Sequence, residues 1–306
     1  MKIAFVTHAG LPELSADDRL AVEELRRRGA RVEPAVWNDS QVRWSAYDRV
    51  VIRSCWDYHL RPDAFLGWLE RLEEERAPLW NPAPVVRGNV DKAYLAGLAA
   101  AGLPVVPTVR LERGEPADLA ALLDRKGWAE AVVKPSVSAS AFRTLRVGRG
   151  DAGAAQAKLE ELLASSGALV QPFLPEIQSG GEWSLIFLGG RYSHAVLKRP
   201  KSGDFRVQQE LGGSADPTVP SHGLIEQARR VVETIPGPWL YARVDGLEIG
   251  GTFTLMELEL TEPSLFLGTD ERAPARFAEA ILGADYAEAV SGTVPAVNEA
   301  SGATSS

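Results

Sequence analysis

Two glutamates share one face of a predicted strand near the carboxyl-terminal end of the sequence. The stretch FTLMELELTEPSLFL, residues 253–267, has the period of a strand, in which successive side chains point to opposite faces. One face is expected to carry Met256, Leu258 and Leu260, and the other Leu255, Glu257 and Glu259. Glutamate is depleted in strands, and like charges held close together repel each other. A divalent cation with oxygen ligands would remove that repulsion. A half-exposed strand with a solvated acidic face explains this segment equally well when it is taken alone.

A third carboxylate precedes this strand. Asp245 stands in YARVDG, at the end of a short predicted strand over residues 241–244 in which Ala242 and Val244 face inward. Three carboxylates from neighbouring antiparallel strands form an open oxygen site that suits Mg²⁺, which usually keeps waters and completes its shell with substrate phosphates. A turn-capping aspartate before Gly246 is the competing interpretation of Asp245.

Two lysines are candidates for binding phosphate. Lys134 ends the predicted strand AVVKP, where an ammonium that faces the interior or a cleft is costly unless an anion such as a nucleotide phosphate meets it. Lys92, in NVDKAYL, lies at the start of a predicted helix. An exposed lysine beside Asp91 is the favoured interpretation of that position from its local sequence alone.

A small polar loop follows Lys134. SVSASA, residues 136–141, contains the hydroxyls of Ser136, Ser138 and Ser140. Such a loop can place backbone N–H groups against phosphates. A plain hairpin connection fits the same residues, because the loop contains no glycine.

An extended connection then offers groups for a nucleoside. Gln171, Phe173 and Leu174 belong to QPFL, whose backbone can contact the edge of a base, and Glu182 can accept hydrogen bonds from ribose hydroxyls. An ordinary crossover between two units is the alternative for this segment.

A basic segment stands out in an otherwise acidic protein. It ends at Gly212-Gly213, and its cationic side chains are Lys198, Arg199, Lys201 and Arg206. Such a cluster predicts an anion site, with a solvated hairpin edge as the alternative. The histidines show no metal-ligand spacing, so we assign none of them a catalytic role.

The elements that must position these residues fall into three predicted units. Residues 1–80 alternate strand and helix and predict a small parallel α/β domain, with strands at 3–7, 31–36 and 49–53. Residues 81–104 are expected to contain a proline-rich linker at 81–84 and a helix at 90–101. The second unit, residues 105–174, has predicted strands at 131–134, 144–147 and 168–171.

Antiparallel pairing dominates the third unit, residues 175–286. The Gly189-Gly190 turn predicts a hairpin of residues 183–188 and 192–198. A helix at 224–235 and further strands at 205–211, 241–244 and 252–260 complete the unit. Residues 287–306, rich in Ser, Gly, Ala and Thr, are expected to form a disordered tail.

The overall composition excludes several classes of protein. In 306 residues, 33 Lys and Arg stand against 41 Asp and Glu, and the net charge of -8 argues against nonspecific nucleic-acid binding or attachment to an anionic membrane. One cysteine, Cys55, leaves no internal disulfide, which fits a reducing compartment. The opening MKIAFVTHAG is too short an apolar run for a signal peptide, and no later run approaches a membrane span. We therefore expect a cytoplasmic protein.

Taken in chain order, these motifs resemble the ATP-grasp enzymes of the glutathione-synthetase-like group. The ordered set is DK, VVKP, a small loop, QPFLP with Gly-Gly-Glu, DFRVQ, VDG and MELELTEPS, spanning residues 81 to about 285. Within that group, NPAPVVRGNVDKAYL, SHAVLKRPKSGDFRVQ and MELELTEPSLFL are most similar to the ATP-dependent cyclo-ligases of D-cycloserine biosynthesis. The resemblance implies an ATP-grasp fold, α/β overall and α+β in its carboxyl-terminal half. Residues 1–80 would be the pre-ATP-grasp domain, 105–174 the lid, and 175–286 the subdomain with the metal site.

The resemblance also assigns roles to individual residues. Lys92 and Lys134 would bind ATP phosphates, the loop at 136–141 would close over them, residues 171–174 would hold adenine, and Glu182 would take the ribose. Two Mg²⁺ ions, with Mn²⁺ as an alternative, would be held by Asp245, Glu257 and Glu259. Arg206 would stabilise a transferred phosphate, and Lys198 is the second catalytic candidate. Two departures stand out: the loop lacks the usual glycines, and Glu259 adds a negative charge where the group often has Asn.

We therefore expect an ADP-forming ligase or cyclo-ligase that phosphorylates a small amino-acid-like substrate and forms a C–N bond or a ring. A kinase with a stable phosphorylated product, and a nucleotide-binding regulatory protein without turnover, are the alternatives. The expected partners are ATP and that substrate, with a homodimer as a further option. SCWDY, residues 54–58, follows a strand at the sheet edge where ligands bind in α/β folds, with a structural corner as the other interpretation.

Overall fold

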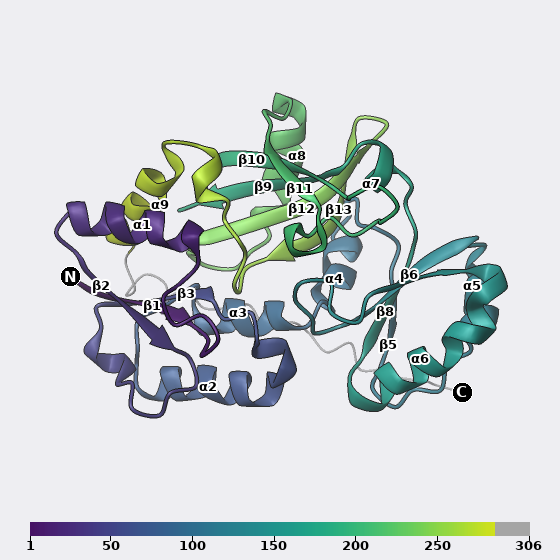
Figure 1. Cartoon of the computed structure of the whole chain (residues 1–306), viewed down its shortest axis with the longest axis horizontal. Coiled ribbons are helices and arrows are strands. Elements are labelled where there is room, and N and C mark those ends of the chain that lie inside the picture. Colours follow the sequence, from purple (N-terminus) through teal and green to yellow (C-terminus); the bar gives the residue numbers. More distant parts are fainter. Residues whose placement is uncertain (285–306) are drawn as a thin grey trace, which may run out of the picture.

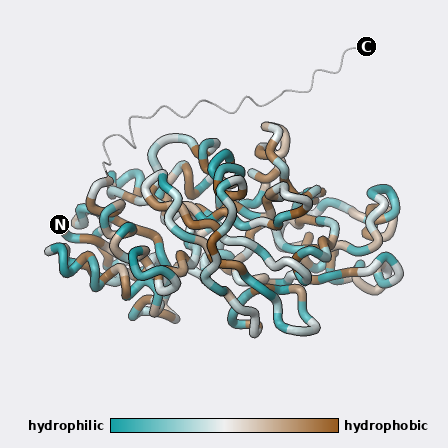
Figure 2. The backbone as a smooth tube through the Cα atoms, turned by 90° about the horizontal axis from the view of Figure 1, so that it is seen from above, coloured by the Kyte–Doolittle hydropathy of each residue, from teal (hydrophilic) through white to brown (hydrophobic). Residues whose placement is uncertain are grey.

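Three separate sheets organise residues 1–284, the part of the chain that the computed structural model describes. Figure 1 shows the amino-terminal sheet at the lower left, a large sheet above it and a third sheet at the right. Seen from above, hydrophobic stretches concentrate in the middle of the molecule, whereas the loops that protrude at one end are mainly hydrophilic (Figure 2). The predicted tail at 287–306 lies outside the described residues.

The amino-terminal sheet is parallel, as the alternating pattern predicts. Its order is β2-β1-β3-β4, from β1 (Lys2–Thr7), β2 (Arg31–Val36), β3 (Arg49–Ser54) and β4 (Leu79–Trp80), with helices α1 (Ala16–Arg27) and α2 (Pro62–Glu74). Successive residues of β1 enter different cores: Ile3 and Phe5 pack in one, and Ala4 and Val6 in the other. The strand is therefore apolar on both faces, as parallel strands usually are.

The segment predicted to be a linker is instead the start of a helix. Residues 83–90 form α3 (Ala83–Val90), and α4 (Tyr94–Ala100) follows, so the predicted single helix at 90–101 is broken at Asp91 to Ala93. Proline at the first turn is compatible with helix because its missing N–H has no intrahelical partner there. Asn81 is fully buried, and its amide bonds the carbonyls of Tyr241 and Leu260 at 2.9 and 2.7 Å, which ties this segment to the large sheet.

The third sheet forms the unit that the resemblance assigns as the lid, and it is called the lid below. Its antiparallel order is β5-β8-β6-β7, from β5 (Val109–Leu111), β6 (Glu130–Pro135), β7 (Leu145–Gly148) and β8 (Ala168–Pro172), with helices α5 (Leu119–Lys126) and α6 (Ala152–Ser165) packed on it. In β6, Ala131 and Val133 enter the lid core, which leaves Val132 and Lys134 on the opposite face. The alternation therefore turns the predicted lysine away from the core.

The large sheet is antiparallel, in the order β11-β10-β9-β12-β13. Its strands are β9 (Glu182–Leu188), β10 (Arg191–Arg199), β11 (Ser214–Pro217), β12 (Tyr241–Ile249) and β13 (Thr252–Glu259), accompanied by α7 (Glu176–Ser179), α8 (His222–Val232) and α9 (Ala273–Gly283). The strand predicted at 205–211 is wrong, because residues 205–208 are irregular and 209–211 form a 3-10 turn. At Gly213 an added Cβ would lie 2.3 Å from the Val207 carbonyl oxygen, so the chain folds back on itself and cannot extend.

A β-bulge corrects the predicted faces of β13. Asp245 pairs with Glu257 and the next residue, Gly246, pairs with Leu255, so Met256 is an extra residue with no partner in the ladder. The bulge reverses the alternation. As a result, Leu255 and Leu258 both enter the core under α8, whereas Met256 turns to the other face with Glu257. The predicted grouping of Met256 with Leu258, and of Leu255 with Glu257, is wrong for this reason.

Among residues 1–284, no helix has the length and apolar character needed to cross a membrane.

Gly246→Ala should destabilise the protein, because an added Cβ would lie 2.6 Å from both the Thr254 carbonyl oxygen and Phe253 Cζ. We expect a loss of about 1–3 kcal/mol in the free energy of unfolding, typical of overpacking. Urea denaturation measures it. The control is Gly153→Ala in α6, where a Cβ meets nothing within 4 Å and alanine should be neutral or stabilising. Equal stability of the two variants would contradict the steric role of Gly246.

Candidate active site

A cavity of about 430 Å³ opens between the three units, and most of the predicted site residues line it. The large sheet supplies β12 and β13, the lid supplies β6 and β8, and the amino-terminal domain closes one end with Ser15, Asp17, Trp56 and Tyr58. The SCWDY loop therefore does lie at a cavity. Ser136 is the one predicted site residue that does not line it: its hydroxyl donates to Asp91 at 2.9 Å.

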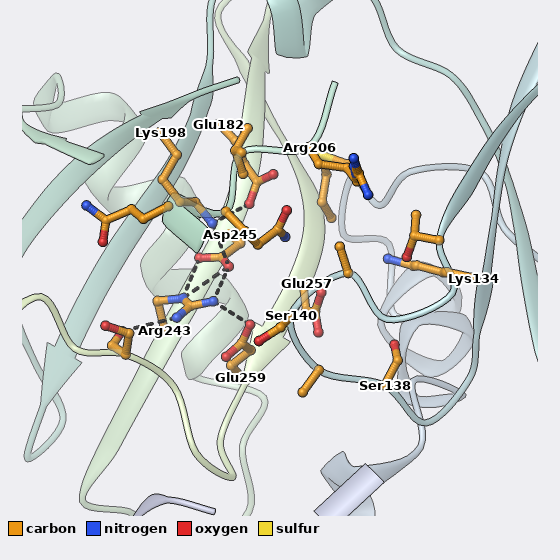
Figure 3. A pocket seen from close by; sticks show the side chains of 18 of the residues that line it. Lys134, Ser138, Ser140, Glu182, Lys198, Arg206, Arg243, Asp245, Glu257 and Glu259 are labelled. Carbon is orange, nitrogen blue, oxygen red and sulfur yellow. Dashed lines mark hydrogen bonds and ion pairs between the residues drawn. The ribbon is translucent and has the colours of Figure 1, made fainter. Parts of the chain in front are cut away.

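Arg243 connects two of the three predicted metal ligands. It lies two residues before Asp245 on β12, so both side chains project to the cavity face (Figure 3). Its guanidinium donates to the Asp245 carboxylate at 2.9–3.1 Å and pairs with Glu259 on the neighbouring strand. Asp245 lies within β12 rather than at a strand end, because that strand continues past the predicted boundary to Ile249. The turn-capping interpretation of Asp245 is therefore wrong.

Asp245 is also held from β9 and β10. Ser184 donates to it at 2.6 Å, and Lys198 lies 3.2 Å from its second oxygen and 2.6 Å from Glu182. Although burial opposes ionisation, Arg243 and then Lys198 lower the pKa of Asp245 to about 2. Burial tends to lower the pKa of Lys198, but the two carboxylates raise it overall. Both side chains are therefore charged at neutral pH.

Glu257 faces Lys92, which lies in the break between α3 and α4. Its carboxylate lies 3.2 Å from the Lys92 ammonium, which also donates to the Ser138 carbonyl at 2.7 Å. Lys92 is only 4% exposed, so the exposed-lysine interpretation is wrong. The break between α3 and α4 turns this lysine inward, where the local sequence predicted a continuous helix. Burial raises the pKa of Glu257, but Lys92 and Lys134 lower it overall.

The three carboxylates are therefore gathered on one face, but each is turned to a protein cation. Asp245 and Glu259 contact Arg243, and Glu257 contacts Lys92. Within residues 1–284, no group of three acidic, His or Cys side chains is arranged as a metal-ligand set. Burial raises the pKa of Glu259 to about 7, in spite of its pairing with Arg243. The donor set is chemically suited to Mg²⁺, since all its atoms are carboxylate oxygens.

Lys134 is the open cation of the cavity. Its ammonium is half-buried, and no described residue lies within ion-pair or hydrogen-bond distance of it (Figure 3). Burial accordingly lowers its pKa. An anion from solution can therefore bind Lys134 without displacing a protein carboxylate.

The glycine-free loop reaches from the lid to the amino-terminal domain. Phe142 packs against His59 in a tilted arrangement with ring centroids 4.9 Å apart, and Val137 and Ala139 pack against the core around α2. Ser138 and Ser140 line the cavity. Three residues without glycine's freedom have left-handed backbones, namely Ser140, Ala141 and Arg143. The loop closes one side of the cavity in spite of that conformational cost.

An apolar wall stands beside Lys134. It is lined by Val132, Phe173, Leu174, Ile177 and Met256. The Phe173 ring is held in place by Arg146, whose guanidinium lies 3.5 Å from the centre of the ring. Gln171 is buried, and its side-chain amide donates to Thr108 at 2.9 Å, so it supports the wall from behind.

Arg206 lies at the cavity rim. It belongs to the irregular segment before Gly213, and its guanidinium pairs with Asp204 at 2.8 Å in the same segment. The structure therefore does not bring Arg206 into the buried network that joins Arg243, Lys198 and Asp245.

Arg243 and Glu262 are two cavity residues that the sequence analysis missed. Arg243 precedes Asp245 by two positions in YARVDG, so strand alternation could have placed the two on one face. Glu262, in the segment that follows β13, shows no such pattern. Burial, with the charge of Glu259 as the next cause, raises its pKa to about 8.

Comparison with known proteins agrees with this architecture. The family model for the amino-terminal domain of D-cycloserine synthetase DcsG matches residues 3–81. The cycloserine biosynthesis protein DcsG of Streptomyces lavendulae is 33% identical over 296 residues, covering 91% of this chain and 97% of that protein. This chain belongs to the DcsG family.

The solved structures extend the agreement to the whole fold. The crystal structure of D-cycloserine synthetase DcsG has a TM-score of 0.79 at 31% identity, covering 92% of this chain and 98% of that one. An ATP-grasp protein from Sphaerobacter thermophilus, a RimK domain protein, has a TM-score of 0.67 at 18% identity, covering 92% of this chain and 100% of that one. The resemblance to ATP-grasp enzymes and the predicted ATP-grasp fold of this family member are confirmed.

Glu262→Gln should change how stability depends on pH. Because the folded pKa of Glu262 lies near 8 and the ordinary value is 4.5, the folded chain binds more protons than the unfolded chain between these values. The contribution of Glu262 to stability is therefore present below pH 4.5 and is lost as pH rises through about 8. We expect the variant to gain on the wild type across this window, by on the order of a few kcal/mol.

Urea unfolding at several pH values measures this difference. Glu248→Gln is the control, because Glu248 is exposed on the same β12 strand and should show no such trend. A constant difference between Glu262→Gln and the wild type at every pH would contradict the prediction.

Proposed function

We propose that this protein is an ADP-forming, ATP-dependent ligase or cyclo-ligase that activates a small amino-acid-like substrate by phosphorylation. One observation supports it most: a single cavity brings the open Lys134 together with the paired carboxylates of β12 and β13. The cavity thus combines a cation suited to phosphate with carboxylates suited to a divalent cation. Membership of the DcsG family supports a C–N bond or a ring as the product, since the relatives' names refer to cycloserine.

The nucleotide would bind on the lid side. Phe173 and Leu174 would cover an adenine, and Lys134 would contact the phosphates together with the loop that carries Ser138 and Ser140. Gln171 would keep the base-binding wall in place rather than contact the base. Glu182 would reach the ribose only after giving up its contact with Lys198.

Mg²⁺ would be held by Asp245, Glu257 and Glu259. The fit rests on the shared oxygen chemistry of these side chains and on their common face. When bound there, Mg²⁺ would supply positive charge to phosphate oxygens. Glu257 would then exchange its contact with Lys92 for the metal, which would free that ammonium for phosphate. Glu259 would likewise share its charge between Arg243 and the metal.

Arg243 is the stronger candidate for stabilising charge that develops during the reaction. It is buried and fixed by two carboxylates, whereas Arg206 is half-exposed at the rim. A fixed, buried donor stabilises a developing anion without reorganising. Lys198 would hold Asp245 in position, and Arg206 would close over the transferred phosphate from the rim. Arg243 is therefore added to the predicted pair Arg206 and Lys198.

The products distinguish this function from its alternatives. With a substrate that stimulates turnover, we expect ADP and free phosphate in equal amounts, because a ligase expels the phosphate it transferred. A panel of amino acids and their analogues, D-serine among them, with separation of nucleotides and a phosphate assay, provides the measurement. AMP and pyrophosphate would overturn the proposal. ADP with a stable phosphorylated product would indicate a kinase, and binding of ATP without stimulated turnover a regulatory protein.

Lys134→Ala should weaken ATP binding. In the wild type, ATP with Mg²⁺ should raise the melting temperature, because a ligand that binds only the folded state stabilises it. The variant should lose most of that shift, since it removes the one cavity cation that the described residues leave open. Lys158→Ala, an exposed lysine of α6 in the same lid, is the matched control and should retain the full shift. An undiminished shift in Lys134→Ala would place the phosphates elsewhere.

A further inference from the structure

The backbone of the segment that follows β13 is held by side chains from distant parts of the chain. Five successive backbone carbonyls, of residues 261–265, each accept a hydrogen bond from a different side chain. In chain order the donors are Tyr241 to Thr261 (2.8 Å), Trp56 to Glu262 (3.1 Å), Arg53 to Pro263 (2.9 Å), Arg243 to Ser264 (3.1 Å) and His194 to Leu265 (2.8 Å). Glu262, Ser264 and Phe266 of this segment line the cavity, and the hydrogen bonds to the backbone fix the positions from which their side chains project.

The carboxylate of Glu262 is the exception within this saturated segment. The residue is only 8% exposed and lines the cavity, yet its carboxylate makes no hydrogen bond or ion pair with any residue in the described range. A buried carboxylate without a partner is strongly unfavourable. The nearby cations are already paired, Lys92 with Glu257 and Arg243 with Asp245 and Glu259. The fold therefore places in the cavity a buried carboxyl group whose hydrogen-bond partner must come from outside the described chain.

A second carboxylate and three rings line the same cavity. Asp17 accepts a hydrogen bond from the Gly268 amide at 3.0 Å through Oδ1, while its Oδ2 is buried without a partner. The rings are those of Trp56, Tyr58 and Phe266. Aromatic faces attract cations. Two incompletely paired carboxylates and an aromatic lining together suit a small organic cation.

We propose that Glu262, with Asp17 as the second carboxyl group of the same cavity, binds the ammonium group of the substrate. This inference rests on the proposed ligase function and identifies the subsite that would orient its substrate. A primary ammonium supplies both the positive charge and the hydrogen-bond donors that these two carboxylates lack. The cavity then has opposite polarity at its two ends: Lys134 faces the nucleotide, and Glu262 faces the amine. A substrate that carries an ammonium would be held with its other end toward the phosphates.

The arrangement predicts discrimination by the amine. An α-hydroxy acid of the same size offers the Glu262 carboxyl group no charged hydrogen-bond donor, and a site built around a polar group rejects analogues that lack it. We expect amino compounds to bind on the order of a hundredfold more tightly than their hydroxy counterparts.

Matched pairs of ligands test the proposal. Both enantiomers of serine and of alanine are compared with glycerate and lactate in the presence of Mg²⁺ and ATP, by calorimetric titration and by substrate-stimulated ADP release. The wild type should prefer the amino compounds. Glu262→Gln should lose that preference through a KM at least about tenfold higher, since it removes the charge but keeps the shape. Asp17→Asn should have the same effect to a smaller extent, and exposed Glu248→Gln should behave as the wild type.

Each result supports or overturns the proposal. Hydroxy acids that bind as well as amino acids, or a Glu262→Gln variant that binds amino compounds normally, would overturn it. A variant with normal KM and reduced kcat would also overturn it, because Glu262 would then act in proton transfer. A wild type that binds ATP but none of the amino compounds would reject the ammonium subsite while leaving the ligase proposal in place. Failure to bind ATP at all would instead refute the proposed function.

Discussion

The ion pairs of the buried Arg243 guanidinium with Asp245 and Glu259 are the interactions on which the site depends. A charge removed from water is tolerated only where it is paired and hydrogen-bonded, and Arg243 meets this condition with two carboxylates and the Ser264 carbonyl. These partners belong to β12, to β13 and to the segment after β13. One side chain therefore fixes three pieces of backbone, and its positive charge offsets the repulsion between the neighbouring carboxyl groups of Asp245 and Glu259.

The other units reach the same place by different contacts. Arg53 of β3 pairs with Asp18 at 2.8 Å and donates to Pro263, so the amino-terminal domain holds the segment after β13 from below. The lid contributes Ser138, whose carbonyl accepts a hydrogen bond from the ammonium of Lys92, and Lys92 also pairs with Glu257 of β13. The cavity face of the large sheet is thus joined by charged contacts to the segments on either side of it.

These contacts also show where the site is expected to rearrange. Lys92 is paired with Glu257, and Arg243 with Glu259. Under the proposed function, metal and nucleotide would replace these protein pairs by ligand pairs. Such exchange avoids leaving a bare buried charge in either state. Lys134 and Glu262 differ from them because neither side chain has an ion-pair or hydrogen-bond partner among the described residues. They are the two groups of the cavity that are already prepared for a ligand.

The sequence alone determined the order of the elements and most of the residues that meet in the cavity. Local rules describe the strand periodicity of β1 and β6 and the turn at Gly189-Gly190, because each involves only a few neighbouring residues. Each motif between Lys92 and Glu259 is likewise short, and most of these residues line the cavity. The fold followed from that order, because the motifs together are specific even where each is weak.

Only the tertiary structure decided the features that depend on distant partners. The bulge at Met256 arises because β13 pairs with Gly246 of another strand, and it moved a methionine into the cavity and Leu255 out of it. Lys92 became buried because the helix breaks beside it, and Glu262 took its place in the cavity because five side chains from elsewhere hold the backbone of its segment. Pairing, burial and desolvation are properties of the assembled chain, which is why alternation along one strand could not predict them.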